Sequence, residues 1–129
     1  MLTEFDAATL LEARPQKYPQ LLLSSLYPRV GGYLRRRYPR QMDIGMTLVK
    51  AGFKDADAYT LDFPLGHFTD YQAYADSVAV EGWRGMDQLT AEELDYLLEQ
   101  LPELMKSVAP AGEFDDVEPV TVARAYKPL

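Results

Sequence analysis

The side chains best suited to specific chemistry in this sequence are the arginines between residues 14 and 40. That segment contains seven basic residues and no acid, whereas residues 1–13 carry three acids and no base, and residues 41–129 carry seventeen acids against six bases. Arginine forms paired hydrogen bonds to carboxylates and phosphates, and tyrosine and arginine are enriched at interface hot spots. We therefore expect this segment to bind a partner through Arg29, Arg35, Arg36, Arg37, Arg40, Tyr27, Tyr33 and Tyr38.

Three interpretations of the basic segment are open. It can bind another protein, it can follow the phosphates of a single-stranded nucleic acid while its tyrosines stack on bases, or it can pair with an acidic helix of the same chain. The net charge of the whole chain is −7, and the acids outside the segment repel a phosphate backbone, which favours a protein over nucleic acid. The acidic helix face consists of Glu92, Asp95, Glu99 and Glu103.

Enzymatic chemistry has one weak candidate, the pair formed by His67 and Asp70. A carboxylate three residues after a histidine can orient it as a general base. His67 is the only histidine and there is no cysteine, so neither a zinc site nor a thiolate nucleophile is expected. The Gly31-Gly32 pair lacks the spacing of a phosphate-binding loop. We therefore expect no enzyme activity, no metal and no cofactor.

Local signals predict most of the helices. Thr3 with Asp6 in the first turn predicts a short helix that ends at Arg14, and Pro19 and Pro28 indicate two helix starts. Pro39 indicates a helix end. The helical spacing of Met42, Met46, Val49 and Phe53 predicts the next helix, which Gly52 terminates.

The second half of the chain contains one short strand, two further helices and an extended tail. Alternation predicts a half-buried strand over residues 59–63, broken by residues 64–66, and Thr69 is the expected cap of the following helix. Thr90 and Glu93 form a capping box that begins a long helix, in which Pro102 predicts a kink or a break. Residues 120–126 alternate again, and the strand at 59–63 is their one expected partner within the chain.

Together these elements predict a mainly α fold, a compact single domain of five or six short helices with a minor two-strand element, with α+β as the alternative. Residues 1–112 are expected to form the helical domain, and residues 113–129 an acidic linker and an extended C-terminal strand or arm. A chain of 129 residues with 47% hydrophobic and 26% charged residues is typical of a soluble globular domain. No secretory signal or membrane span is apparent, which favours a cytoplasmic protein.

The leading functional hypothesis is a small acidic interaction protein that binds another protein as an adaptor, chaperone or inhibitor, and the formation of homo-oligomers is left open. It would use the Arg/Tyr-rich segment or the acidic helix face. One alternative is an immunity or anti-defence inhibitor in which the acidic face mimics nucleic acid. The other is an enzyme that uses His67 and Asp70.

Overall fold

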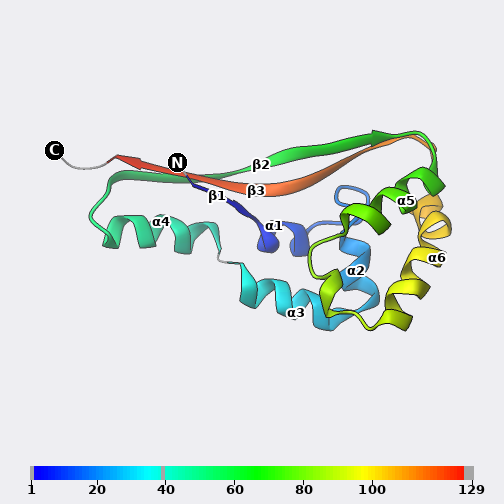
Figure 1. Ribbon diagram of the computed structural model, residues 1–129. Coiled ribbons are helices and arrows are strands. Elements are labelled where there is room, and N and C mark those ends of the chain that lie inside the picture. Colours follow the sequence, from blue (N-terminus) through cyan, green and yellow to red (C-terminus); the bar gives the residue numbers. More distant parts are fainter. Residues whose placement is uncertain (1, 39, 127–129) are drawn as a thin grey trace.

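The computed structural model describes residues 2–38 and 40–126, which form an antiparallel sheet and a set of helices. The three strands follow the order β1-β3-β2. Figure 1 shows the sheet along one side of the molecule and the helices gathered on the other. The strands are β1 (Leu2–Phe5), β2 (Lys54–Phe68) and β3 (Phe114–Tyr126). The helices are α1 (Ala7–Glu12), α2 (Leu21–Leu26), α3 (Pro28–Arg37), α4 (Gln41–Lys50), α5 (Tyr71–Glu81) and α6 (Ala91–Val108), with a 3-10 helix η1 (Met86–Gln88) before α6.

The fold is therefore α+β, and the expectation of a mainly α fold with a minor two-strand element is wrong. The error lies in the sheet, because β2 has 15 residues and β3 has 13. Both are much longer than the usual strand of about five or six residues. The expected number of helices, five or six, agrees with the six α-helices of the described ranges.

β2 continues through Pro64, Leu65 and Gly66, where the sequence indicated a break. The strand pairing shifts here, because Pro64 lies opposite Val117 while Gly66 lies opposite Asp116, so β2 contains one extra residue. A proline is tolerated at this position because β2 lies at the edge of the sheet, where an outward-facing N–H needs no partner in the ladder. The sequence signal for a turn is therefore a bulge within a long edge strand.

β3 is the middle strand of the sheet, and the acidic linker expected before it is wrong for residues 114–118. Asp116 is buried in the strand and Glu118 is half-buried. The predicted pairing of residues 120–126 with the strand at 59–63 is confirmed for residues 120–122, which lie opposite residues 59–61. Residues 123, 124 and 126 pair with residues 58, 57 and 54, nearer the start of β2. On its other side β3 pairs with β1. The idea that residues 1–112 form a domain of their own stays a prediction.

The first helix begins after Asp6 and not at Thr3, because Thr3 belongs to β1. Asp6 Oδ1 accepts a hydrogen bond from the backbone N–H of Thr9 at 3.0 Å, and Asp6 Oδ2 accepts from the hydroxyls of Thr9 and Thr60 at 2.8 and 2.6 Å. The Asp6 N–H donates to the Pro119 carbonyl at 2.9 Å. Burial acts to raise the pKa of Asp6, but the hydrogen bonds from Thr60 and Thr9 outweigh it and lower that pKa overall. One residue thus links the β1–α1 junction to both long strands.

α4 ends as the sequence predicts. Gly52 has a φ of +92°, the Phe53 N–H donates to the Leu48 carbonyl at 3.1 Å, and the Gly52 N–H donates to the Val49 carbonyl at 3.0 Å. These two bonds define the Schellman motif, which satisfies carbonyls at the helix end. The side chain of Met42, part of the predicted spacing, lies outside the described residues.

The other helix boundaries agree in part with the expected ones. α1 ends at Glu12, two residues before the expected end, and α2 begins two residues after Pro19. α3 has Pro28 at its first position and ends at Arg37. The helix end expected at Pro39 lies outside the described residues.

In the second half, the N-cap of α5 is Asp70, one residue after the expected Thr69, and it accepts from two backbone N–H groups. The capping box of Thr90 and Glu93 is confirmed at the start of α6. The helix then continues through Pro102 to Val108 as one element, so the alternative of two consecutive helices is wrong.

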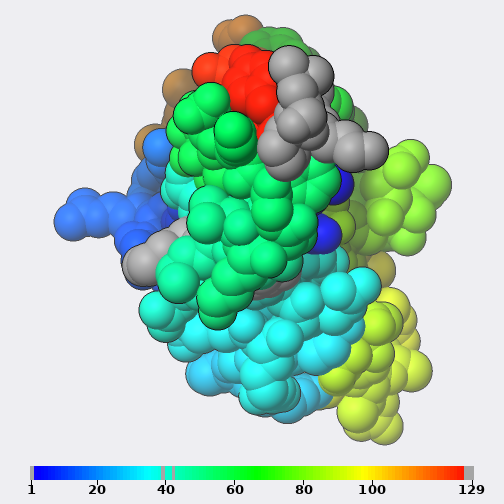
Figure 2. All heavy atoms as spheres, turned by 90° about the vertical axis from the view of Figure 1, so that its left-hand side faces the viewer, coloured from blue at the N-terminus to red at the C-terminus, as the bar shows by residue number. Residues whose placement is uncertain are grey.

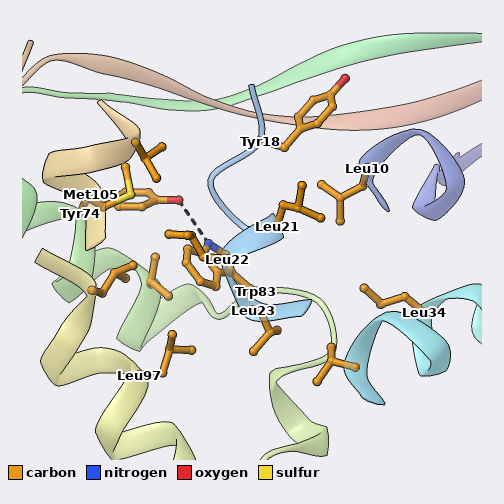
Figure 3. Close-up of a cluster of buried hydrophobic side chains, with 14 of the residues drawn as sticks. Leu10, Tyr18, Leu21, Leu22, Leu23, Leu34, Tyr74, Trp83, Leu97 and Met105 are labelled. Carbon is orange, nitrogen blue, oxygen red and sulfur yellow. Dashed lines mark hydrogen bonds between the residues drawn. The ribbon is translucent and has the colours of Figure 1, made fainter. Parts of the chain in front are cut away.

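The core lies among α1, α2, α3, α5 and α6, as Figure 3 shows. The indole N–H of Trp83, in the loop after α5, donates to the hydroxyl of Tyr74 at 3.2 Å, so the largest aromatic side chain is held at a fixed orientation. α4 is different, because none of its side chains that the structure describes is fully buried. The principal buried residues are Leu10, Leu21, Leu22, Leu23, Val30, Leu34, Tyr74, Val78, Trp83, Leu97, Leu101 and Met105.

We predict that Asp6→Ala lowers the free energy of unfolding by about 2–4 kcal/mol, because the variant loses a helix cap and leaves the hydroxyl of Thr60 without its partner. Urea denaturation measures this difference. Because the pKa of Asp6 is lowered, the stability that its carboxylate contributes is complete above the pKa of the unfolded chain, about 4. This stability declines as the pH falls below that pKa. Exposed Glu4→Ala is the control, and equal urea midpoints for the two variants would contradict the assignment.

Candidate functional site

Four arginines form an exposed surface at and just beyond the C-terminal end of α3. We call Arg35, Arg36, Arg37 and Arg40 the arginine ridge, and all four are exposed. α3 takes this orientation because Val30 and Leu34 on its other side are buried in the core. Basic residues are also stabilised in the last turn of a helix, where the helix dipole is negative. Figure 2 shows the atoms of α3, in cyan, as a broad outward face below α4.

The arginine ridge has no ionic partner within the described ranges, where no carboxylate oxygen lies within 4.0 Å of its four guanidinium groups. Arg35 and Arg40 line a small hollow of about 120 Å³ together with Tyr38 and Glu12. Glu12 therefore contributes one acid to the edge of the ridge without forming a salt bridge. The ridge keeps its hydrogen-bonding capacity for another molecule.

Arg29 behaves differently, because it pairs with α6 of the same chain. Its Nη1 donates to Glu93 Oε2 at 2.8 Å, its Nη2 contacts the other carboxylate oxygen, and Nη2 also donates to the Gln88 carbonyl at 3.1 Å. The hydrogen bond from Arg29, followed by that from the Thr90 backbone, lowers the pKa of Glu93 to about 2. The internal pairing considered from the sequence thus occurs at Arg29.

Of the four tyrosines of the basic segment, Tyr18 is buried in the core, and Tyr27, Tyr33 and Tyr38 are half-buried against it. The Tyr27 hydroxyl donates to the Glu93 carbonyl at 3.4 Å, and the Tyr38 ring packs edge-on against Phe5 with centroids 5.0 Å apart. Tyr33 also packs against the core. Their rings support α3, and the guanidinium of Arg37 lies 5.2 Å from the centre of the Tyr38 ring.

Arg84 is a structurally important residue that sequence reasoning missed. It donates to both carboxylate oxygens of Glu118 at 2.9 and 3.1 Å and to the Tyr38 hydroxyl at 3.3 Å. Its guanidinium also lies 4.6 Å from the centre of the Phe5 ring. The bond to Glu118, above all, raises the pKa of Arg84. The neighbouring Gly85 is the one feature of the sequence that could have drawn attention to Arg84.

Gly85 allows the loop that carries Arg84 to approach α3. It has a φ of +90°, and a Cβ at this position would lie 2.6 Å from Cγ1 of Val30. A side chain would therefore push the loop away from α3. Arg84 would then be displaced from Glu118.

The acidic face of α6 is exposed, as expected for a solvated helix surface. Glu92, Asp95 and Glu99 form no salt bridge with any described residue, whereas Glu103 bonds Lys106 at 2.7 Å. The acidic face and the arginine ridge therefore do not pair with each other in the described part of the chain, and the contact between α3 and α6 is made by Arg29 and Glu93 instead.

The structure does not bring His67 and Asp70 together. His67 lies on β2, where Nδ1 contacts Asp115 at 2.7 Å and Nε2 contacts Glu113 at 2.8 Å. Asp70 accepts backbone N–H groups at the start of α5. His67 is exposed and both of its ring nitrogens are engaged, so the proposed base–carboxylate pair is wrong.

The edge strand β2 carries a row of exposed apolar side chains at alternate positions before its bulge. Tyr59, Leu61 and Phe63 are 37, 52 and 56% exposed. Long exposed edge strands pair readily with other strands, so this row is a second candidate binding surface. The Ala58 carbonyl at the start of the row accepts a hydrogen bond from the side chain of Gln41 in α4.

No helix in residues 2–38 and 40–126 is both long and apolar enough to span a membrane. Over the same ranges, no three His, Asp or Glu side chains are grouped as metal ligands would be. No protein-family model matches this chain, and neither a curated protein nor a solved structure shows significant similarity to it. Its function is therefore argued from its own residues.

We predict that the imidazole of His67 titrates above the ordinary value of about 6.5, because Asp115 and then Glu113 stabilise its protonated form. The stability that this contributes is present below the unfolded pKa and is lost as the pH rises through the folded pKa. NMR titration of the single histidine measures this pKa. Asp115→Asn with Glu113→Gln should lower the pKa, whereas Asp70→Asn should leave it unchanged, and the reverse pattern would refute the assignment.

Proposed function

We propose that this chain is a small acidic interaction protein whose arginine ridge binds an acidic surface of another protein, as an adaptor, chaperone or inhibitor would. The observation that carries the proposal is a difference among the arginines. Arg29 and Arg84 have carboxylate partners within the chain, while the four arginines of the ridge are exposed and without such a partner in its described part.

Charge repulsion within the ridge supports a partner of opposite sign. Four guanidinium groups within six consecutive positions repel one another, and carboxylates of a partner relieve that repulsion while accepting paired hydrogen bonds. The acids on the rest of the chain orient the encounter, because they repel an acidic surface while the ridge attracts it.

A protein partner is favoured over a nucleic acid for two reasons. The ridge occupies one helix end, so it can neutralise few phosphates, and the net charge of −7 repels the remainder of a nucleic acid. Tyr27, Tyr33 and Tyr38 are also half-buried against the core, which reduces the stacking surface that they offer to a single-stranded nucleic acid.

The test compares two double charge reversals in the same basic segment. Arg35→Glu/Arg36→Glu alters the ridge, and Arg14→Glu/Lys17→Glu gives the same change of net charge at residues outside it. We expect affinity capture from the native extract, followed by binding measurements on the recovered protein, to show binding by the wild type and the Arg14/Lys17 variant. Binding should fall at least about tenfold in the Arg35/Arg36 variant and weaken with added salt.

Equal loss of binding in both double variants would mean that partner binding depends on net charge alone, and it would contradict the proposed site. Tighter binding of a fluorescent single-stranded oligonucleotide than of the captured protein would assign the ridge to nucleic acid. The two measurements together decide between these partners.

The edge of β2 supports a second candidate, self-association through antiparallel pairing of two β2 strands. With the twofold axis at Leu61, Tyr59 of one copy lies opposite Phe63 of the other, and Asp62 lies opposite Thr60. Within residues 59–63, apolar residues then face apolar residues and no acid faces an acid, and such cross-strand pairs are favourable. The exposed row on β2 is the observation that favours this arrangement.

We predict a dimer for the wild type and a monomer for Leu61→Lys/Phe63→Lys, measured by size-exclusion chromatography with light scattering across a concentration series. The added lysines place like charges at the centre of the strand pair. Val80→Lys/Tyr96→Lys is the matched control, because Val80 and Tyr96 are exposed on α5 and α6 and should not affect the dimer. A wild type that stays monomeric at the highest concentration would remove this candidate.

A further inference from the structure

A cleft of about 550 Å³ lies between the β2–β3 ribbon and the C-terminal end of α5. Its size is within the usual range of small-molecule sites, about 300–1,000 Å³. Trp83 and Phe68 provide aromatic surface, and Gln20, Glu81 and Asp116 provide polar groups. The cleft is separate from the arginine ridge, because no ridge residue lines it.

Two buried polar atoms in the cleft wall have no hydrogen-bond partner in the described part of the chain. They are Oδ1 of Asp116 and Nε2 of Gln20, on side chains whose residues are 6 and 5% exposed. Leaving such groups unpaired costs free energy, so natural structures rarely do so without a reason. Asp116 Oδ1 needs a hydrogen-bond donor, and Gln20 Nε2 needs an acceptor.

The charges around the cleft favour a cation. Arg84 also lines it, but both oxygens of Glu118 already bind its guanidinium. Asp116 and Glu81 then remain as unneutralised acids. An anionic ligand would be repelled by both carboxylates, whereas a protonated amine would be attracted.

A pKa of about 6 leaves the carboxyl of Asp116 mostly ionised at pH 7. Burial raises its pKa to about 6, the charge of Glu118 acts in the same direction, and the hydroxyl of Tyr74 opposes the rise. The other charged groups that line the cleft are Glu81 from α5 and Arg84 from the following loop. Asp116 therefore changes charge just below physiological pH.

We propose that this cleft binds a small organic amine that carries an apolar body and an oxygen acceptor. The ammonium group pairs with the carboxylate of Asp116, and the ligand oxygen accepts from the amide of Gln20. Both side chains turn toward the cleft to make these contacts, because their unpaired atoms are buried in its wall. The apolar body lies against Trp83 and Phe68, where a cation is also attracted to the aromatic rings.

Trp83 makes the proposal directly testable, because it is the only tryptophan in the chain and it lines the cleft. Three matched probes separate charge from shape: tyramine is cationic, 4-ethylphenol is neutral and 4-hydroxyphenylacetate is anionic. We expect tyramine to change the tryptophan emission saturably and to bind at least about tenfold more tightly than either analogue. Excitation at the long-wavelength edge of tryptophan absorption avoids the phenols, and calorimetry provides a second readout.

Asp116→Asn keeps the shape of the side chain and removes its charge, so we expect it to weaken tyramine binding about tenfold or more. Asp95→Asn on the exposed face of α6 is the control and should bind as the wild type does. Wild-type affinity should also fall as the pH drops below about 6, where Asp116 gains a proton while an alkylamine stays charged.

Absence of a saturable response to tyramine, or equal affinity for the neutral or anionic analogue, would overturn the proposal, as would unchanged binding by Asp116→Asn. Because the probe series uses only the wild type, it decides the question even if that variant fails to fold. A lysine-containing peptide that bound more tightly than tyramine would assign the cleft to a side chain of a partner protein and not to a free amine.

Discussion

The two outer strands of the sheet, β1 and β2, are both held by β3, which follows all the helices in the sequence. β1 and β2 do not pair with each other, so neither has a backbone partner until β3 lies between them. Asp6 reinforces this arrangement, because its N–H bonds Pro119 in β3 while its carboxylate binds Thr60 in β2. Contacts far apart in sequence therefore hold the sheet, whereas the helices form from local signals.

The same organisation determines which charges are available to other molecules. Arg84 binds Glu118 of β3, and Arg29 binds Glu93 at the start of α6, so each of these cations joins two elements of the fold. The arginine ridge lies beyond the buried part of α3 and makes no such link within the described residues. Within a basic segment that looks uniform in sequence, Arg29 thus supports the fold, whereas the four arginines of the ridge are exposed and without an ion pair in the described residues, and this difference underlies the proposed function.

The sequence predicted the elements whose signals are local. Pro28 at the start of α3, Gly52 at the end of α4, and the Thr90 capping box of α6 each depend on bonds within a few residues. The sheet was largely missed, because an acidic stretch and a proline are typical of loops, while here they occupy the middle strand and an exposed edge. The burial of Asp116 and the role of Arg84 arise only from contacts between distant segments, which spacing along the chain does not reveal.

The position of β3 also has a consequence for biosynthesis. A ribosome that adds about 5–20 residues per second needs roughly 2–9 s to make the 45 residues between the end of β2 and the start of β3. During that interval β2 presents two unpaired backbone edges and its row of apolar side chains to the surroundings. Nascent chains of this protein are therefore good substrates for chaperones that recognise extended hydrophobic segments, and slower translation over that stretch would lengthen their exposure.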